Sequence, residues 1–98
     1  MSYRPLDLDG RVAVVVGGTS GIGRAITLGL AEAGADVIAS ARGADNLEAT
    51  AAEIEARGRR TLRVQSDVAD RGSLDALRDA VLAGFGWVDI LVNCAGRI

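Results

Sequence analysis

Short apolar runs alternate along the chain with longer segments in which apolar residues recur every three or four positions. The run Val12–Val16 is continuous and β-branched, which is typical of a strand buried on both faces. Further strands are predicted at Asp36–Ala39, around Leu62 and Val64, and at Ile90–Val92. The strand around Leu62 and Val64, the third along the chain, alternates apolar with polar residues, which indicates one exposed face.

Helical periodicity predicts three helices between these strands. The apolar stripes expected to face the core are Ile22, Ile26, Leu30 and Ala33 in the first helix, Leu47, Ala51 and Ile54 in the second, and Leu74, Leu77, Val81 and Phe85 in the third. Glycines follow the last turn of each helix, as is common at helix C-termini: Gly34, Gly58, and the pair Gly84 and Gly86.

Acidic residues stand where the second and third helices begin. Asp45 is expected to be an N-cap with Glu48 as its capping-box partner, and Asp70 is expected to cap the third helix. The order strand, helix, strand repeated along the chain predicts one α/β domain over residues 1–98, with a parallel sheet and right-handed crossovers.

The strand patterns also predict positions within the sheet. The continuous strands at 12–16 and 90–92 should be central, and the alternating third strand should lie at an edge. Four strands in the order 3-2-1-4 form a doubly wound parallel sheet of the Rossmann type. No internal repeat, linker or low-complexity segment interrupts the pattern.

Composition narrows the chemistry. The 98 residues carry a formal net charge of −2, which argues against an electrostatic nucleic-acid binder. All eleven basic residues are arginine, so no imidazole or amine is present to act as a base or a metal ligand. The single Cys94 excludes an internal disulfide, predicts no metal site and suits a reducing cytoplasm. The apolar runs are too short for a signal core or a membrane span.

A glycine-rich loop lies between the first strand and the first helix. Glycines at such a position let a phosphate approach backbone amides at a helix N-terminus, where the helix dipole favours anions. Thr19 and Ser20 can donate hydroxyl hydrogen bonds to phosphate or stabilise the loop. The candidate phosphate-binding residues are Gly17, Gly18, Thr19, Ser20, Gly21, Ile22 and Gly23.

The spacing of this loop, Gly-x-x-x-Gly-x-Gly, resembles the short-chain dehydrogenase/reductase family. The resemblance runs from about Leu6 to the end of the chain and implies the cofactor-binding N-terminal half of such an enzyme. Val16 departs from the family, which usually has threonine there and uses its hydroxyl to tie the loop to the neighbouring strand. This departure leaves the phosphate-facing backbone intact.

The end of the second strand bears on cofactor choice. Dinucleotide folds commonly place an acid here to bind the ribose hydroxyls, whereas arginine accommodates a 2′-phosphate. The chain has Ala41 where NAD-preferring relatives have aspartate, followed by Arg42. The planar guanidinium suits phosphate, so NADP(H) is the expected cofactor, with NAD(H) as a second possibility. The alternative is that Arg42 is only a solvated loop residue.

Two further segments resemble the family. Asp67 and Val68 match its Asp-Val at the adenine pocket, where the carboxylate would accept from the adenine amino group; the alternative is that Asp67 only caps a turn. The segment from Asn93 to Gly96 resembles the family's Asn-Asn-Ala-Gly, in which Ala95 and Gly96 would leave space for the nicotinamide ribose. Cys94 replaces the second asparagine and is interpreted as a small buried residue.

The family's catalytic serine and Tyr-x-x-x-Lys have no counterpart in the chain, so no catalytic residue is assigned. The resemblance implies an oxidoreductase that transfers hydride between a nicotinamide cofactor and a carbonyl or alcohol substrate, without nucleic acid or membrane and as a homo-oligomer when whole. The 98-residue chain alone is expected to be an inactive fragment that is marginally stable and self-associates. Two alternatives are a non-catalytic dinucleotide-binding or interaction module and a methyltransferase, although Ala41 and the glycine spacing speak against the latter.

Overall fold

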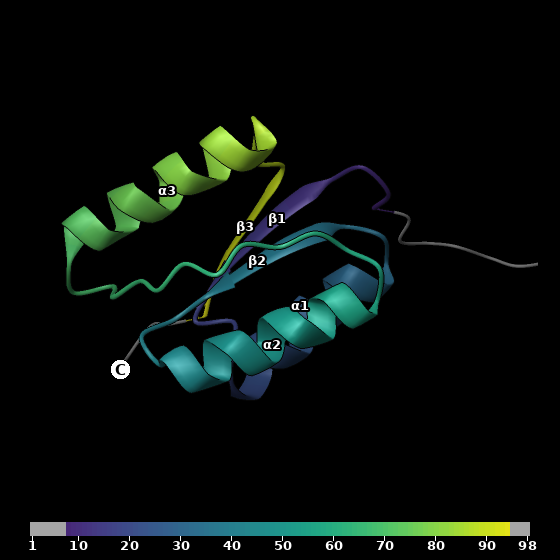
Figure 1. Ribbon diagram of the computed structural model, residues 1–98, viewed down its shortest axis with the longest axis horizontal. Coiled ribbons are helices and arrows are strands. Elements are labelled where there is room, and N and C mark those ends of the chain that lie inside the picture. The colour runs from purple at the N-terminus through teal and green to yellow at the C-terminus, as the bar shows by residue number, and fades with distance from the viewer. Residues whose placement is uncertain (1–7, 95–98) are drawn as a thin grey trace, which may run out of the picture.

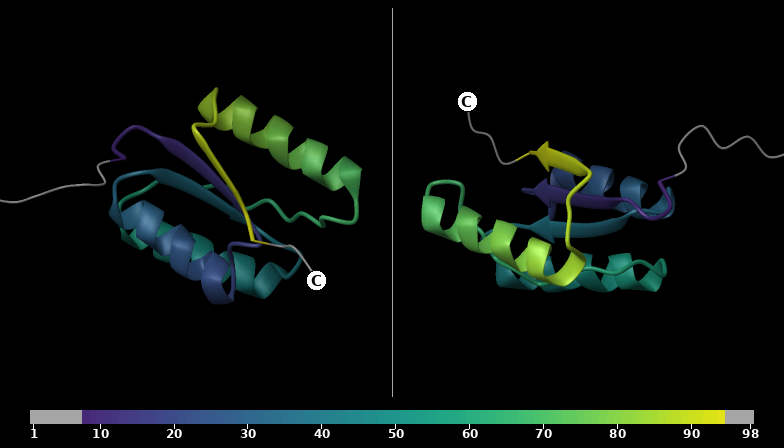
Figure 2. Two further views of the ribbon diagram at one scale, coloured as in Figure 1. Left: turned by 180° about the vertical axis from the view of Figure 1, so that it is seen from behind. Right: turned by 90° about the horizontal axis from the view of Figure 1, so that it is seen from above.

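A computed structural model describes residues 8–94. Three strands and three helices follow one another along these residues. They are β1 (Val12–Val16), α1 (Gly21–Glu32), β2 (Asp36–Ser40), α2 (Ala44–Ala56), α3 (Arg71–Phe85) and β3 (Ile90–Asn93). The strands form one parallel sheet in the order β2-β1-β3. Helices α1 and α2 cover one face of the sheet and α3 covers the other, as Figures 1 and 2 show.

This arrangement confirms the doubly wound α/β class, but the sheet has three strands rather than four. Residues 61–66 run beside β2 without forming a strand. Two backbone hydrogen bonds hold the segment at its ends, from Val37 N–H to the Arg60 carbonyl (3.2 Å) and from Ser66 N–H to the Ala41 carbonyl (3.0 Å). Between them the Ser40 hydroxyl donates to the Val64 carbonyl, so a side chain occupies an acceptor that a strand ladder would use.

The core lies on both faces of β1, as its continuous apolar run predicts. Val12, Val14 and Val16 pack with the α3 side chains, whereas Ala13 and Val15 pack with Ala31 of α1 and Ile54 of α2. The expected stripes of α2 and α3 are confirmed. The buried residues are Leu47, Thr50, Ala51 and Ile54 in α2 and Leu77, Val81 and Phe85 in α3, and Leu74 is partly buried.

The expected stripe of α1 is right only in part: Leu30 is partly buried against the core, but the fully buried residues of the helix are others. Ile22 is 78% exposed, and the buried residues are Gly23, Thr27 and Ala31. These small residues recur every four positions and bring the helix axis close to the sheet. The helix therefore buries the face that carries its small residues, and the partly buried Ile26 lies at the border of this face.

The helix ends agree with the sequence in part. Asp70 caps α3 by accepting from the Gly72 N–H (2.9 Å), and the glycines at positions 34 and 86 adopt positive φ beyond α1 and α3. Asp45 is not the N-cap of α2. Gly43 holds that position and no side chain caps it, so Asp45 lies two residues later, within the first turn, where its charge still favours the helix dipole.

Within residues 8–94, strand β3 lies beside β1 at the end of the sheet, where the expected order 3-2-1-4 places it, although its continuous apolar run also predicted a central position. Ile90 and Val92 pack toward α1, but Leu91 on the other face is 70% exposed. A continuous apolar run is compatible with burial on both faces but does not require it.

Asp89 fixes the start of β3. Its carboxylate accepts from the Val12 N–H (2.9 Å) and from the Trp87 indole N–H (2.9 Å), and Arg11 lies 3.6 Å away. The hydrogen bond from Val12, helped by those from Trp87 and Arg11, lowers the pKa of Asp89. The charged carboxylate therefore links the N-terminal ends of β1 and β3, and the glycine loop lies at the opposite ends of the strands.

No helix among the described residues is long and apolar enough to cross a membrane.

Candidate dinucleotide-binding site

The carboxyl ends of the three parallel strands meet at one edge of the sheet. β1 is followed by the glycine loop, β2 is followed by Ala41 and Arg42, and β3 ends at Asn93, which lies opposite Val16 in the register. The segment 66–69 lies beside the end of β2. The structure thus gathers the candidate residues between Gly17 and Asn93 at one edge, where ligands bind in open α/β sheets. Ala95 and Gly96 lie outside the described residues.

The glycine loop makes a sharp exit from β1 and turns directly into α1. Gly17 has φ +79°, a conformation that side-chain-bearing residues rarely adopt. Gly23 packs so closely that an added Cβ would lie 2.0 Å from the Gly17 carbonyl oxygen and 3.2 Å from the Cys94 Cβ. Ser20 is exposed at the N-cap of α1 and makes no side-chain capping bond, whereas Thr19 is buried. The helix N-terminus is therefore open to a ligand.

Two contacts hold this loop despite valine at position 16. The Gly17 N–H donates to the Ser40 carbonyl (2.7 Å), and the buried Thr27 hydroxyl donates to the Gly18 carbonyl (3.1 Å). Thr27 was not among the residues expected to matter. The signal in the sequence is its position four residues after Gly23 on the face that packs against the sheet.

Arg42 differs from most of the arginines. Among the nine arginines within residues 8–94, seven form ion pairs with carboxylates; the seven are Arg11, Arg24, Arg57, Arg59, Arg60, Arg63 and Arg78. Arg42 is exposed, and its guanidinium forms no ion pair with any residue in that range. It remains available to an anion at the end of β2.

A cavity of about 350 Å³ lies beside Arg42. It is lined by Val16 at the end of β1 and Gly17 of the loop, by Ala41 and Arg42 directly after β2, and by the four residues 66–69 from the segment before α3. Residue 41 has no carboxylate that would repel a phosphate here.

Asp67 already has a structural role at this cavity. Its Oδ1 accepts from the Ala69 N–H (2.9 Å), which stabilises the turn before α3. The turn-capping alternative is therefore present in the structure. A carboxylate has acceptor capacity beyond one bond, so this contact is compatible with a second partner. Val68 is 46% exposed and offers an apolar surface to a flat ring.

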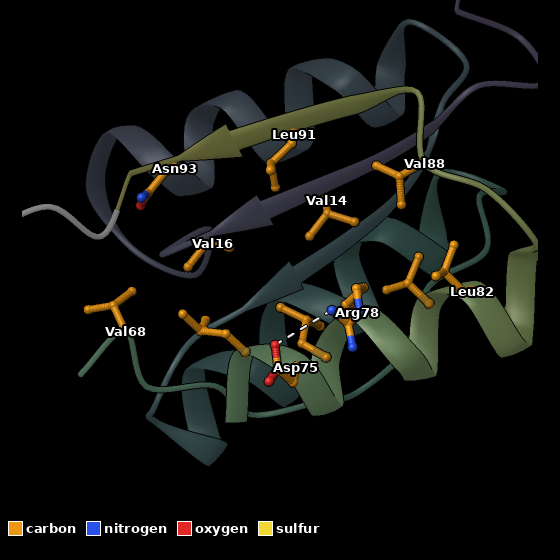
Figure 3. Close-up of a pocket in the computed structure, with 12 residues that line it drawn as sticks. Val14, Val16, Val68, Asp75, Arg78, Leu82, Val88, Leu91 and Asn93 are labelled. Carbon is orange, nitrogen blue, oxygen red and sulfur yellow. Dashed lines mark ion pairs between the residues drawn. The ribbon is translucent and has the colours of Figure 1, made fainter. Parts of the chain in front are cut away.

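An apolar hollow of about 710 Å³ adjoins this edge between the sheet and α3. Figure 3 shows Val16, Val68 and Asn93 at one end of it and Leu82 and Val88 at the other. Val68 therefore lines both the hollow and the smaller cavity.

Cys94, next to Asn93 in the chain, is partly buried against the α1 side of the sheet and is a free thiol.

Comparison of the chain with known proteins identifies its family. The short chain dehydrogenase family model matches residues 11–98. The chain belongs to the short-chain dehydrogenase family. A 2-dehydro-3-deoxy-D-gluconate 5-dehydrogenase of Escherichia coli is 42% identical over 100 residues, covering 100% of this chain and 38% of that protein. A D-threitol dehydrogenase of Mycolicibacterium smegmatis is 46% identical over 89 residues, covering 91% and 34%.

Solved structures of short-chain dehydrogenases agree. The L-sorbose reductase of Gluconobacter frateurii, in complex with NADPH and L-sorbose, has a TM-score of 0.88 and 43% identity. The match covers 94% of this chain and 35% of that structure. The chain thus spans about a third of the length of these relatives, rather than the expected half.

Proposed function

We propose that the chain forms the cofactor-binding part of an NADP(H)-dependent oxidoreductase, which transfers hydride between the nicotinamide and a carbonyl or alcohol substrate. The observation that carries the cofactor assignment is Arg42, an exposed arginine without an ion pair in residues 8–94, at a cavity whose strand end has Ala41 in place of an acid. The relative L-sorbose reductase, which is bound to NADPH in its structure, supports the same assignment.

The residues present fit a dinucleotide. The open N-terminus of α1 suits the pyrophosphate, because backbone amides point out of it and the positive end of the helix dipole favours anions. The space that a Cβ at Gly23 would fill is taken by the loop carbonyl, so the loop can lie flat against the helix start. Asp67 and Val68 would contact the adenine, and Asn93 the nicotinamide side. When bound, NADP(H) would supply or accept the hydride.

Within this proposal the chain's own residues bind and orient the cofactor but do not transfer protons. No residue of the sequence matches the family's acid–base tyrosine with its lysine, and the chain contains no lysine or histidine. We therefore expect no turnover from the 98-residue polypeptide with NADPH and a panel of aldehydes and ketones. Repeated NADPH oxidation above a buffer control would contradict this. Cofactor binding without turnover is also expected of a non-catalytic dinucleotide-binding module. A Tyr-x-x-x-Lys in the sequence of the whole protein would decide for the oxidoreductase, and its absence would decide for the module.

The cofactor assignment is tested by titrating NADP(H) and NAD(H) against wild type, Arg42→Ala and Arg78→Ala. Removing Arg42 should weaken NADP(H) binding by about 1–3 kcal/mol, the range of a hydrogen bond to a charged group, and leave NAD(H) nearly unchanged. Arg78 is a matched control because it is an exposed arginine on α3 whose partners are the surface carboxylates of Asp75 and Asp79. Equal losses for both cofactors would refute a 2′-phosphate site at Arg42.

A further inference from the structure

The two walls of the cavity beside Arg42 come from segments that are not joined by a strand ladder. One wall is the end of β2 with Ala41 and Arg42, and the other is residues 66–69. Because residues 61–66 form no strand, individual hydrogen bonds must set the distance between the walls. The buried hydroxyls of Ser40 and Ser66 form one such bond (2.8 Å), between the last residue of β2 and a residue that lines the cavity.

Three successive carbonyls at the end of β2 accept one hydrogen bond each. The Ser40 carbonyl accepts from the Gly17 N–H (2.7 Å), and the Ala41 carbonyl accepts from the Ser66 N–H (3.0 Å). The Arg42 carbonyl accepts from the side-chain amide of Gln65 (2.6 Å). The first two bonds join backbone to backbone, whereas the third depends on one exposed side chain.

The bond from Gln65 matters because it is the hydrogen bond that ties Arg42 itself to another part of residues 8–94; the neighbouring carbonyls of Ala41 and Gly43 accept from other backbone amides. The Arg42 guanidinium has no partner there, and the next residue, Gly43, allows the chain wide freedom before α2 begins at Ala44. An arginine that must meet a phosphate loses side-chain and backbone freedom on binding, so a fixed backbone reduces that cost.

We propose that Gln65 is a positioning residue for cofactor selectivity, which holds the Arg42 backbone so that its guanidinium faces the 2′-phosphate of NADP(H). This inference rests on the proposed function. Gln65 itself need not touch the cofactor. Since the Arg42 carbonyl is exposed, water replaces the lost donor when Gln65 is removed, and the free energy of unfolding changes little.

The experiment is a double-mutant cycle on the ratio of the Kd values for NADP(H) and NAD(H). The four proteins are wild type, Gln65→Met, Arg42→Ala and the double variant. Methionine has nearly the length of glutamine and lacks an N–H donor. Gln65→Met should weaken NADP(H) binding about threefold to tenfold, the range of a single hydrogen bond, with NAD(H) binding within about twofold of wild type. It should have no further effect on the ratio when Arg42 is already alanine.

The outcomes separate the two proposals. If Arg42→Ala leaves the ratio unchanged, the 2′-phosphate site is refuted and the role of Gln65 with it. If Arg42→Ala shifts the ratio but Gln65→Met does not, only the role of Gln65 is refuted. Equal weakening of both cofactors by Gln65→Met, or an undiminished effect in the Arg42→Ala background, would show that Gln65 supports the fold or contacts the cofactor rather than acting through Arg42. Urea denaturation of each variant reports any loss of stability directly.

Discussion

Replacing Gly23 by alanine tests the contact that brings the glycine loop against α1. The new Cβ would lie 2.0 Å from the Gly17 carbonyl oxygen and 3.0 Å from its carbon. Real Cβ atoms essentially never approach another heavy atom within 3.0 Å, so the carbonyl must move by about 1 Å. The clashing atom is backbone, which cannot rotate away as the end of a side chain can.

The expected cost follows from two opposing effects. Overpacking of this kind destabilises proteins by about 1–3 kcal/mol. Alanine is favoured over glycine inside a helix by roughly 0.5–1 kcal/mol, which offsets part of that loss. We expect Gly23→Ala to lower the free energy of unfolding by about 1–2 kcal/mol. With a urea m-value near 1 kcal/mol/M, the midpoint should fall by about 1–2 M.

Gly29→Ala is the matched control, because it lies in the same helix with no atom within 4 Å of its added Cβ. That variant should raise the free energy of unfolding by roughly 0.5–1 kcal/mol. NADP(H) binding should fall at least tenfold in Gly23→Ala and stay unchanged in Gly29→Ala, since only the first displaces the loop. If both variants are equally stabilised and bind alike, the close packing at Gly23 does not hold the loop in place.

Two further predictions concern other parts of the fold. The pKa of Asp89 is lowered by its hydrogen bond from Val12, so its charged form is favoured in the folded state. The stability advantage of wild type over Asp89→Asn should therefore be present at pH 7 and shrink as pH falls below about 4, measured by urea denaturation; a difference independent of pH would contradict this. Leu91 is 70% exposed on the edge strand β3. Leu91→Thr should reduce self-association of the chain in sedimentation velocity, and an unchanged distribution would exclude this face as the contact.

Most of the element order could be predicted, because the apolar runs and helix-ending glycines act locally. Val12–Val16 is a strand buried on both faces, and Asp70 caps α3, as the sequence indicates. The α1 stripe could not be found by following large apolar side chains alone, because the fully buried residues of the helix are Gly23, Thr27 and Ala31, while Leu28 and Leu30 are only partly buried. A spacing of four between small residues was the signal that hydrophobicity alone ignores.

The third predicted strand failed for a different reason. Leu62 and Val64 do pack against the core, so their alternation correctly reported one buried face. Burial does not fix the hydrogen-bond partners of a backbone, however. Here the hydroxyls of Ser40 and Ser66 and the amide of Gln65 take part in the joining of this segment to β2. Such long-range side-chain hydrogen bonds depend on tertiary contacts and produce no repeating pattern of residue types from which the sequence could predict them.

The location of the candidate site was predictable, since parallel strands place their carboxyl ends at one edge and loop residues follow each end. The roles of the individual residues in this site were less predictable. The sequence left open whether Asp67 caps a turn or binds a ligand, and the structure shows the turn contact. The sequence singled out Arg42 by its position after Ala41, but it could not show that Arg57 and Arg63 form ion pairs and Arg42 forms none within residues 8–94, because ion pairing depends on which carboxylates the fold brings near.

The three helix N-termini explain how a chain with a net charge of −2 offers a place for a polyanion. Two of them are supplied with acid from the chain itself: Asp70 caps α3, and Asp45 lies in the first turn of α2. The first turn of α1 contains no acidic residue, and the Ser20 side chain makes no capping bond. The helix dipole is therefore neutralised by the protein at α2 and α3 and left unopposed at α1. Under the proposed function, attraction for phosphate would be a local property of the α1 N-terminus and Arg42, and it would not require a positively charged protein.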